Sequence, residues 1–313
     1  MNLTVAFAAA GTLVLWASAF PMIRLALREG YGPGELTLAR FVIATVTLVI
    51  ILCLRTSSRG GIRGALLPAS EWKYLVPLGF IGVALYHLAL NYGARTTDAG
   101  TVAMLIATSP VFTAGLAVLL LGERLKATGW IGIAVSCSGA VLIAVGKDGR
   151  LGLSPGAALV LLAAMLAAMW AVMQRPIVRR IGPMRTTTYA TCIGTVFLLP
   201  FLPSLIRTVQ SASVSTNIGV LYLGILPAAI ANVLWAYALG KVPASRLAVF
   251  MYLMPPISIF IAWLFLNEVP TTLAMIGGAI AIAGVVIVNT SKGSSAARIA
   301  QQAVPSPAAN AGD

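Results

Sequence analysis

Long apolar runs separated by short polar breaks dominate the chain. Ten runs of about 17 to 23 residues are predominantly apolar, and the breaks between them carry Gly, Pro, Lys or Arg. A run of this length crosses about 30 Å of hydrocarbon as a helix, whereas strands of a membrane β-barrel are shorter and alternate apolar with polar residues. We therefore expect an all-α integral membrane protein. Its predicted transmembrane helices cover residues 3–23, 36–54, 74–93, 99–121, 128–146, 155–173, 186–206, 217–239, 247–266 and 272–289.

The composition favours a lipid bilayer as the solvent. Of the 313 residues, 59% are hydrophobic and 9% are charged, against about 25% charged in a soluble domain. The net charge of +13 comes from Lys and Arg scattered between the apolar runs, which indicates topology signals and argues against nucleic acid as a partner. The three cysteines, Cys53, Cys137 and Cys192, lie inside apolar runs and predict neither a disulfide framework nor a metal site.

Basic residues set the predicted orientation. With the N-terminus in the cytoplasm, the inner loops and tail hold 14 Lys and Arg, and the outer loops hold 6. Because cytoplasmic loops are enriched in Lys and Arg, we expect both termini on the cytoplasmic side. Residues 291–313 are rich in Ala, Ser, Pro and Gln, which predicts a disordered cytoplasmic tail.

The second half of the chain repeats features of the first at an offset of 145 residues. The coincidences predict a duplicated five-helix unit, covering 1–147 and 154–290. An odd number of helices reverses the chain, so the second unit is inverted relative to the first, as in transporters that bind substrate near the midplane. The alternative is a duplication that serves stability only. The matched pairs are Tyr92 and Tyr237, Pro110 and Pro255, Glu123 and Glu268, Gly132 and Gly277, and Gly139 and Gly284.

The motifs of the two units resemble those of a known family. Trp-Ala stands near the end of each first helix, at Trp16-Ala17 and Trp170-Ala171, and a Gly-spaced fifth helix follows the Pro and Glu of the fourth. This pattern resembles the EamA family of the drug/metabolite transporter (DMT) superfamily over about residues 5–290. The resemblance implies a multi-pass carrier of the bacterial inner membrane that exports amino acids or other small metabolites. Many members carry Gly in place of Ala17 and Ala171, and a Lys further along the first helix, so the substrate stays open.

Polar side chains in the third and eighth runs are the first candidate substrate ligands. His87 and Asn91 are four residues apart and share a helix face. The offset of 145 places Asn232 at the depth of His87, and Trp235 shares the face of Asn232. Polar groups at this depth face the bundle interior or a wet cavity. The alternative is an interhelical hydrogen bond that holds the bundle together.

Two tryptophans are candidates for an aromatic wall beside the substrate. Trp16 lies in the first run, Trp170 in the sixth, and Gln174 follows Trp170 on the same face. An aromatic face packs an apolar side chain or attracts an ammonium group. Tyr86 and Tyr189 are further candidates for this wall. The alternative is that the tryptophans anchor the helices at the membrane interface.

Mid-span prolines mark the fourth and ninth runs. A proline removes a backbone hydrogen bond and kinks a helix, which supplies a flexible point for gating and frees a carbonyl for a ligand. The alternative is a static packing kink. The prolines and the candidate side chains before them are Thr101, Met104, Thr108 and Pro110, then Tyr252 and Pro255.

Charged residues within or at the ends of runs give further expectations. Arg40 lies near the outer end of the second run, which predicts that its side chain snorkels to the surface, with carboxylate binding as the alternative. Glu123 and Glu268 end the fourth and ninth runs. We expect both to pair with basic residues, such as Arg124 or Lys126 for Glu123.

The sequence predicts an alternating-access exporter of small metabolites, with amino acids as the leading substrates. No Asp or Glu lies mid-span, which favours transport down the substrate gradient or coupling through His87. The chain has no ATP-binding GxxxxGK[ST] motif. We expect no catalytic residue, cofactor or metal, and a monomer whose partners are substrate and lipid. The alternatives are a carrier of nucleotide-sugar-like or phosphorylated solutes, an intramembrane lipid-modifying enzyme, and a scaffold or receptor.

The first run ends in WASAFP, whose small residues resemble the cleavage site of a signal peptide. The stretch before it has no Lys or Arg, so the positive region of a signal peptide is absent. The run also has a counterpart in the second unit that ends in MWAVMQRP. We therefore expect it to be retained as the first helix, where small residues let neighbouring helices approach closely.

Overall fold

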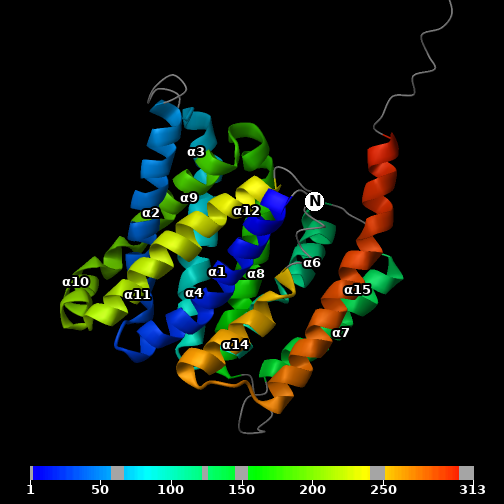
Figure 1. Cartoon of the computed structure of the whole chain (residues 1–313). Coiled ribbons are helices and arrows are strands. Elements are labelled where there is room, and N and C mark those ends of the chain that lie inside the picture. The colour runs from blue at the N-terminus through cyan, green and yellow to red at the C-terminus, as the bar shows by residue number, and fades with distance from the viewer. Residues whose placement is uncertain (1–2, 58–66, 122–125, 145–153, 240–250, 303–313) are drawn as a thin grey trace, which may run out of the picture.

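The computed structural model describes residues 3–57, 67–121, 126–144, 154–239 and 251–302, and every regular element in these ranges is helical (Figure 1). The predicted all-α fold is confirmed for this part of the chain. In chain order the elements are α1 (Leu3–Arg28), α2 (Pro33–Ser57), α3 (Ala69–Gly79), η2 (Phe80–Leu85), α4 (Tyr86–Ala94), α5 (Ala99–Ile106), α6 (Ser109–Leu121), α7 (Ala127–Ala144), α8 (Pro155–Ile181), α9 (Pro183–Leu198), η3 (Leu199–Phe201), α10 (Leu202–Ser211), α11 (Val214–Ile225), η4 (Leu226–Ile230), α12 (Ala231–Leu239), α14 (Met254–Leu266) and α15 (Thr272–Gln302).

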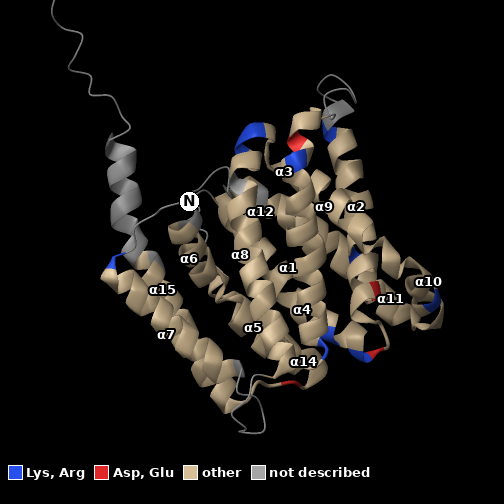
Figure 2. Cartoon of the chain, turned by 180° about the vertical axis from the view of Figure 1, so that it is seen from behind, with Lys and Arg blue, Asp and Glu red and all other residues tan. Residues whose placement is uncertain are grey.

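The helices form a bundle whose middle is apolar. Seven helical segments are long and apolar enough to cross a membrane. Lys, Arg, Asp and Glu gather near the two ends of the bundle (Figure 2). The protein is thus a multi-pass membrane protein, as predicted. The seven segments are Leu3–Arg28, Pro33–Arg55, Ala69–Ala94, Ala99–Leu116, Pro155–Ile181, Pro183–Ser211 and Val214–Trp235, and the shorter apolar helices are Ala127–Ile143, Met254–Leu266 and Thr272–Val288.

Two of the long segments contain a π-helical turn, and we call them the first and second bulged helices. The first consists of α3, η2 and α4, and the second of α11, η4 and α12. The two π-turns coincide to within one residue at the offset of 145. A π-turn inserts an extra residue, breaks the regular hydrogen-bond ladder and is frequent at functional sites.

Each mid-span proline lies in the first turn of a helix that follows a turn. A turn at Ala107 and Thr108 separates α5 from α6, which has Pro110 as its second residue. A turn at Tyr252 and Leu253 precedes α14, which has Pro255 as its second residue. Proline is accepted in the first turn of a helix because its missing N–H would have no partner there.

Helices α7 and α15 form a close pair at one edge of the bundle (Figure 1). Gly132 lies against the backbone of Gly284, and Gly139 lies against the backbone of Gly277. The first pair joins an early residue of α7 to a late residue of α15, and the second pair does the reverse, so the helices run antiparallel. Small residues allow this close approach of two backbones in a membrane.

The C-terminal helix is longer than the sequence analysis expects. Helix α15 continues to Gln302, through the first part of the segment 291–313 assigned above to a disordered tail. The Ala, Ser, Arg and Gln residues of this part are compatible with a helix once α15 has started. The rest of that predicted tail, 303–313, lies outside the described residues.

Candidate functional site

Trp16 of α1 lies against the second bulged helix. Its indole Nε1 donates a hydrogen bond to the carbonyl oxygen of Pro227 at 3.2 Å. Its ring is 5.2 Å from the ring of Trp235, centre to centre, in a tilted arrangement. Pro227 lies in the π-turn η4, where the broken ladder leaves carbonyl groups available to side chains. The indole thus contacts another helix in the bundle, unlike a tryptophan that only anchors its helix at the interface.

Trp170 of α8 has the same relation to the first bulged helix. A Cβ added at Gly82, in the π-turn η2, would overlap the indole of Trp170. Gly82 and Pro227 are equivalent at the offset of 145, and Trp16 and Trp170 are the equivalent tryptophans of the two predicted units. Each tryptophan therefore lies against the π-turn of the opposite half of the chain.

His87 and Asn232 make matching bonds just after the two π-turns. His87 Nδ1 is 3.0 Å from the carbonyl oxygen of Val83, and Asn232 Nδ2 donates to the carbonyl oxygen of Ala228 at 2.7 Å. Both bonds join a side chain to the residue four positions earlier in its own helix. The bond therefore satisfies a backbone carbonyl and orients the side chain, and it does not tie two helices together.

Asn91 makes the interhelical bond that the sequence analysis considered. This fully buried residue of α4 donates from Nδ2 to Thr37 Oγ1 of α2 at 2.8 Å. The Thr37 hydroxyl in turn donates to the carbonyl oxygen of Pro33 at 2.6 Å. The amide oxygen Oδ1 of Asn91 has no hydrogen-bond partner among the described residues.

Arg40 is buried, and the expectation that it snorkels to the surface is wrong. Its side chain on α2 is 3% exposed, and its Nε and Nη1 have no hydrogen-bond partner in the described part of the chain. Packing of α2 against α4, α9 and α11 encloses this face of the helix. The sequence position near a helix end suggested an exposed side chain because hydropathy says nothing of which neighbours cover a helix.

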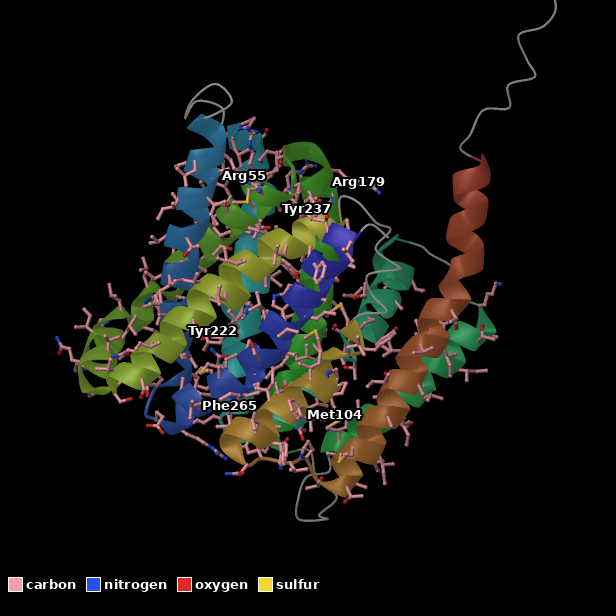
Figure 3. The ribbon with its side chains drawn as sticks, in the orientation of Figure 1. Arg55, Met104, Arg179, Tyr222, Tyr237 and Phe265 are labelled. Atoms are coloured by element: carbon pink, nitrogen blue, oxygen red, sulfur yellow. The ribbon has the colours of Figure 1, made fainter. Side chains whose placement is uncertain are left out.

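The candidates on α5 and in the turn after it make hydrogen bonds within the segment or pack on α15. Thr101 Oγ1 donates to Asp98 Oδ2 at 2.8 Å, and Thr108 Oγ1 donates to the carbonyl oxygen of Leu105 at 2.6 Å. Met104 is 3% exposed, and its thioether lies against Gly278 of α15 (Figure 3). The structure thus places these three side chains in a helix cap, a turn and a packing contact.

The remaining candidates are half-buried. Tyr86 lies beside His87, with ring centres 4.3 Å apart, and Tyr189 meets Trp72 edge-on at 6.0 Å. Gln174 of α8 and Tyr252, in the turn before α14, are also half-buried. A contact absent from the sequence analysis joins Ser18 of α1 to Tyr222 of α11, whose hydroxyl oxygens are 2.6 Å apart (Figure 3). Ser18 lies in the WASAFP stretch, which the structure places inside a long helix of the bundle.

Glu268 joins three segments at the end of the bundle. It pairs with Arg24 of α1 at 3.1 Å and with Arg28, and its Oε2 accepts a hydrogen bond from the backbone N–H of Ala99 at 3.3 Å. Arg24 also donates to the carbonyl oxygens of Ala94 and Arg95. The arginine partners lie some 240 residues away in sequence, so only the fold brings them to Glu268. Glu123 lies outside the described residues.

Comparison with known families identifies the chain. The EamA-like transporter family matches it twice, over residues 3–145 and 154–290. A "Probable terminal-alkyne amino-acid exporter" of Streptantibioticus cattleyicolor is 38% identical over 89% of this chain and 91% of its own. An uncharacterised transporter of Bacillus subtilis, YdfC, is 35% identical over 87% of this chain and 86% of its own.

A solved structure shares the fold. A crystal structure of a protein with 19% sequence identity superposes with a TM-score of 0.59 and covers 96% of this chain and 99% of its own. The family match spans most of both halves of the chain, and the named relatives are transporters. The chain belongs to the EamA-like transporter family and is a membrane transporter.

Proposed function

We propose that this transporter exports amino acids across the bacterial inner membrane by alternating access. In this proposal ten helices form two inverted five-helix repeats, 1–147 and 154–290, with both termini in the cytoplasm. The substrate lies between the repeats, near Trp16, Trp170, His87 and their neighbours. The breaks before Pro110 and Pro255 provide the flexible points at which the interrupted helices bend.

The reciprocal contacts of the two tryptophans, each with the bulged helix of the other half of the chain, carry the proposal. Trp16 reaches the π-turn of the second half, and Trp170 reaches the π-turn of the first half. A two-fold rotation between inverted halves produces such reciprocal contacts. A contact from a residue of the first half to the second half requires the equivalent contact from the second half to the first. Carriers with inverted repeats expose the substrate to either side by moving one repeat against the other.

The glycine contacts agree with the same relation. The pair Gly132–Gly284 becomes the pair Gly139–Gly277 when each residue is replaced by its equivalent at the offset of 145. Gly79 packs against Ile193 of α9, and its equivalent, Gly224, packs against Ile43 of α2.

The choice of amino acids rests on the relative from Streptantibioticus cattleyicolor. That protein carries the name of an amino-acid exporter, and it aligns with most of this chain. The half-buried aromatic rings of Trp16 and Trp235 supply a surface that suits an apolar side chain or an ammonium group.

Transport in proteoliposomes tests the proposal. We expect counterflow of radiolabelled amino acids, measured with a panel of apolar, polar and terminal-alkyne members such as L-propargylglycine. Flux of phosphorylated solutes without flux of any amino acid would contradict the proposed substrate. Absence of flux for every solute in an otherwise folded preparation would contradict transport by this chain alone.

The orientation needs a separate measurement. Ser211→Cys lies at an exposed position at the end of α10, and Ser70→Cys lies at an exposed position in α3. The proposed topology places the first outside the cell and the second inside. In a variant that lacks the native cysteines, a membrane-impermeant maleimide added to intact cells is expected to label the first only, and the reverse labelling would overturn the orientation.

A further inference from the structure

The guanidinium of Arg40 is a buried charge that forms no ion pair within the described bundle. Its side chain is 3% exposed, and two of its nitrogens, Nε and Nη1, have no hydrogen-bond partner among the described residues. The guanidinium carbon lies 5.9 Å from the centre of the Phe41 ring, and this cation–π contact offsets only part of the cost of burying a charge without an ion-pair partner. Charges inside membrane proteins usually mark substrate or ion pathways. The cost of Arg40 therefore calls for a role beyond packing.

The carboxylates that form described ion pairs are used by other arginines. Glu268 pairs with Arg24 and Arg28, and Glu71 pairs with Arg180 at 3.0 Å. No described carboxylate forms an ion pair with Arg40. A carboxylate that arrives with a substrate would supply the missing acceptor, because Nε and Nη1 are charged donors left without one.

Asn91 presents the complementary group, an acceptor without a donor. The Thr37 hydroxyl gives its hydrogen to the carbonyl oxygen of Pro33, so Thr37 Oγ1 can only accept from Asn91. This requirement makes the nitrogen of the Asn91 amide the atom that faces Thr37, and it fixes the orientation of the amide. The amide oxygen is consequently left buried and unpartnered.

The two unsatisfied groups belong to one cluster. Thr37 and Arg40 are three residues apart on α2 and share a face, so the bond between Asn91 and Thr37 brings α4 to the same face. The guanidinium of Arg40 lies over the ring of its neighbour Phe41. The ring of His87 also lies 4.4 Å from the ring of Phe41, the neighbour of Arg40.

We propose that Arg40 binds the carboxylate of the transported amino acid and that the amide oxygen of Asn91 accepts a hydrogen bond from its ammonium group. This inference rests on the proposed amino-acid export and names the part of the substrate that the α2–α4 cluster recognises. The side chain of the substrate makes no contribution to these two bonds, so the cluster selects for the α-amino-acid group itself.

Analogues that lack one charged group test the inference on the wild-type protein. Counterflow in proteoliposomes is measured with L-propargylglycine, with its amide and with 4-pentynoic acid, at a mildly acidic pH that keeps the amine of the amide protonated. Because a bond to a charged group is worth about tenfold or more in affinity, we expect each analogue to be weaker than the amino acid by at least that factor. Equal flux of L-propargylglycine and its amide would overturn the inference and leave amino-acid export intact. Absence of flux for every amino acid would instead overturn the proposed function, and the inference with it.

Variants of Arg40 test whether this residue produces the preference for L-propargylglycine over its amide. Arg40→Met keeps an unbranched apolar stem and removes the charge, and Arg40→Lys keeps the charge without the planar guanidinium. We expect Arg40→Met to lose the preference for L-propargylglycine over its amide and Arg40→Lys to retain part of this preference. The control Arg207→Met, at an exposed site on α10, is expected to keep it. Arg40→Met removes an unpaired buried charge, so its Tm is expected to be equal to or above that of wild type. Retention of the preference in Arg40→Met would overturn the inference.

Asn91→Ala provides a second, independent test of the site if Arg40→Met is not recovered as folded protein. It leaves the charge of Arg40 in place and removes the proposed acceptor for the ammonium group. We expect this variant to lose the preference for L-propargylglycine over 4-pentynoic acid and to keep the preference for L-propargylglycine over its amide. An unchanged preference for the ammonium group in Asn91→Ala would overturn the assignment.

Discussion

The hydroxyl oxygens of Thr45 on α2 and Thr195 on α9 lie 2.9 Å apart and share a hydrogen bond. Their numbers differ by 150, and so do those of Ile43, which packs on Gly224, and Ile193, which packs on the equivalent Gly79. The Thr45–Thr195 bond therefore joins two equivalent positions of the proposed repeats. A residue that touches its own equivalent lies beside the axis that relates the repeats.

When the two proposed repeats exchange conformations during transport, a contact between equivalent residues maps onto itself and is expected to persist, which gives a first prediction. In a variant that lacks the native cysteines, Thr45→Cys with Thr195→Cys is expected to form a disulfide under oxidation and to retain transport. Counterflow before and after reduction measures the effect, and each single cysteine variant is the control. Loss of transport on oxidation that is restored by reduction would show that α2 and α9 separate during the cycle.

The contact between Gly82 and Trp170 gives a second prediction. Gly82→Ala places a methyl group where the indole of Trp170 lies, so the indole must shift away from the π-turn. We expect a loss of about 1–3 kcal/mol of stability, as for other overpacked sites, and slower transport. Thermal unfolding and counterflow measure the two effects. The matched control is Gly115→Ala, since a Cβ at Gly115 meets no atom within 4 Å and the change removes a helix-destabilising glycine.

Replacement of His87 by asparagine, the residue at the equivalent position 232, gives a third prediction. Both side chains bond to the carbonyl oxygen four residues earlier, so His87→Asn is expected to keep that bond and to retain the fold. His87→Ala leaves the ring contacts with Phe41 and Tyr86 empty and is expected to cost about 1–3 kcal/mol in stability. Comparison of the two unfolding temperatures checks this order. A greater loss in His87→Asn than in His87→Ala would contradict the assigned role of the carbonyl bond.

Glu268 gives a fourth prediction, because it bridges α1 and the start of α5. Glu268→Gln removes the charge that pairs with Arg24 and Arg28, and it is expected to loosen this end of the bundle by about 1–3 kcal/mol. Labelling of a cysteine at Ala99, which is 1% exposed, is expected to become faster in this variant. Glu29→Gln, at an exposed position beyond α1, is the control. Equal labelling rates in both variants would mean that Glu268 does not close this end.

The sequence predicted the features that depend on side-chain hydropathy and on local backbone chemistry. Apolar runs located the helices, and Pro110 and Pro255 marked the places where helices are interrupted. The offset of 145 also paired His87 with Asn232, which then proved to make the same bond.

Features that depend on backbone register and on distant neighbours were beyond the sequence. The π-turn at Phe80–Leu85 is a change in hydrogen-bond register, and hydropathy does not encode it. The burial of Arg40 depends on the helices that cover α2, and the partners of Glu268 come from α1. Gly82 and Pro227 occupy equivalent positions at the offset of 145, and both residue types weaken a regular helix. This coincidence was the available sequence signal for the two π-turns.

The π-turns also constrain how the chain can vary in length. Each residue of a helix turns the next by about 100°, so one residue deleted between the π-turn and His87 would point His87 and Asn91 to a different side of the helix. The loops at the two ends of the bundle can gain or lose residues without such a rotation. Insertions and deletions are therefore expected to accumulate in the loops and to spare the short stretch from Gly82 to Asn91.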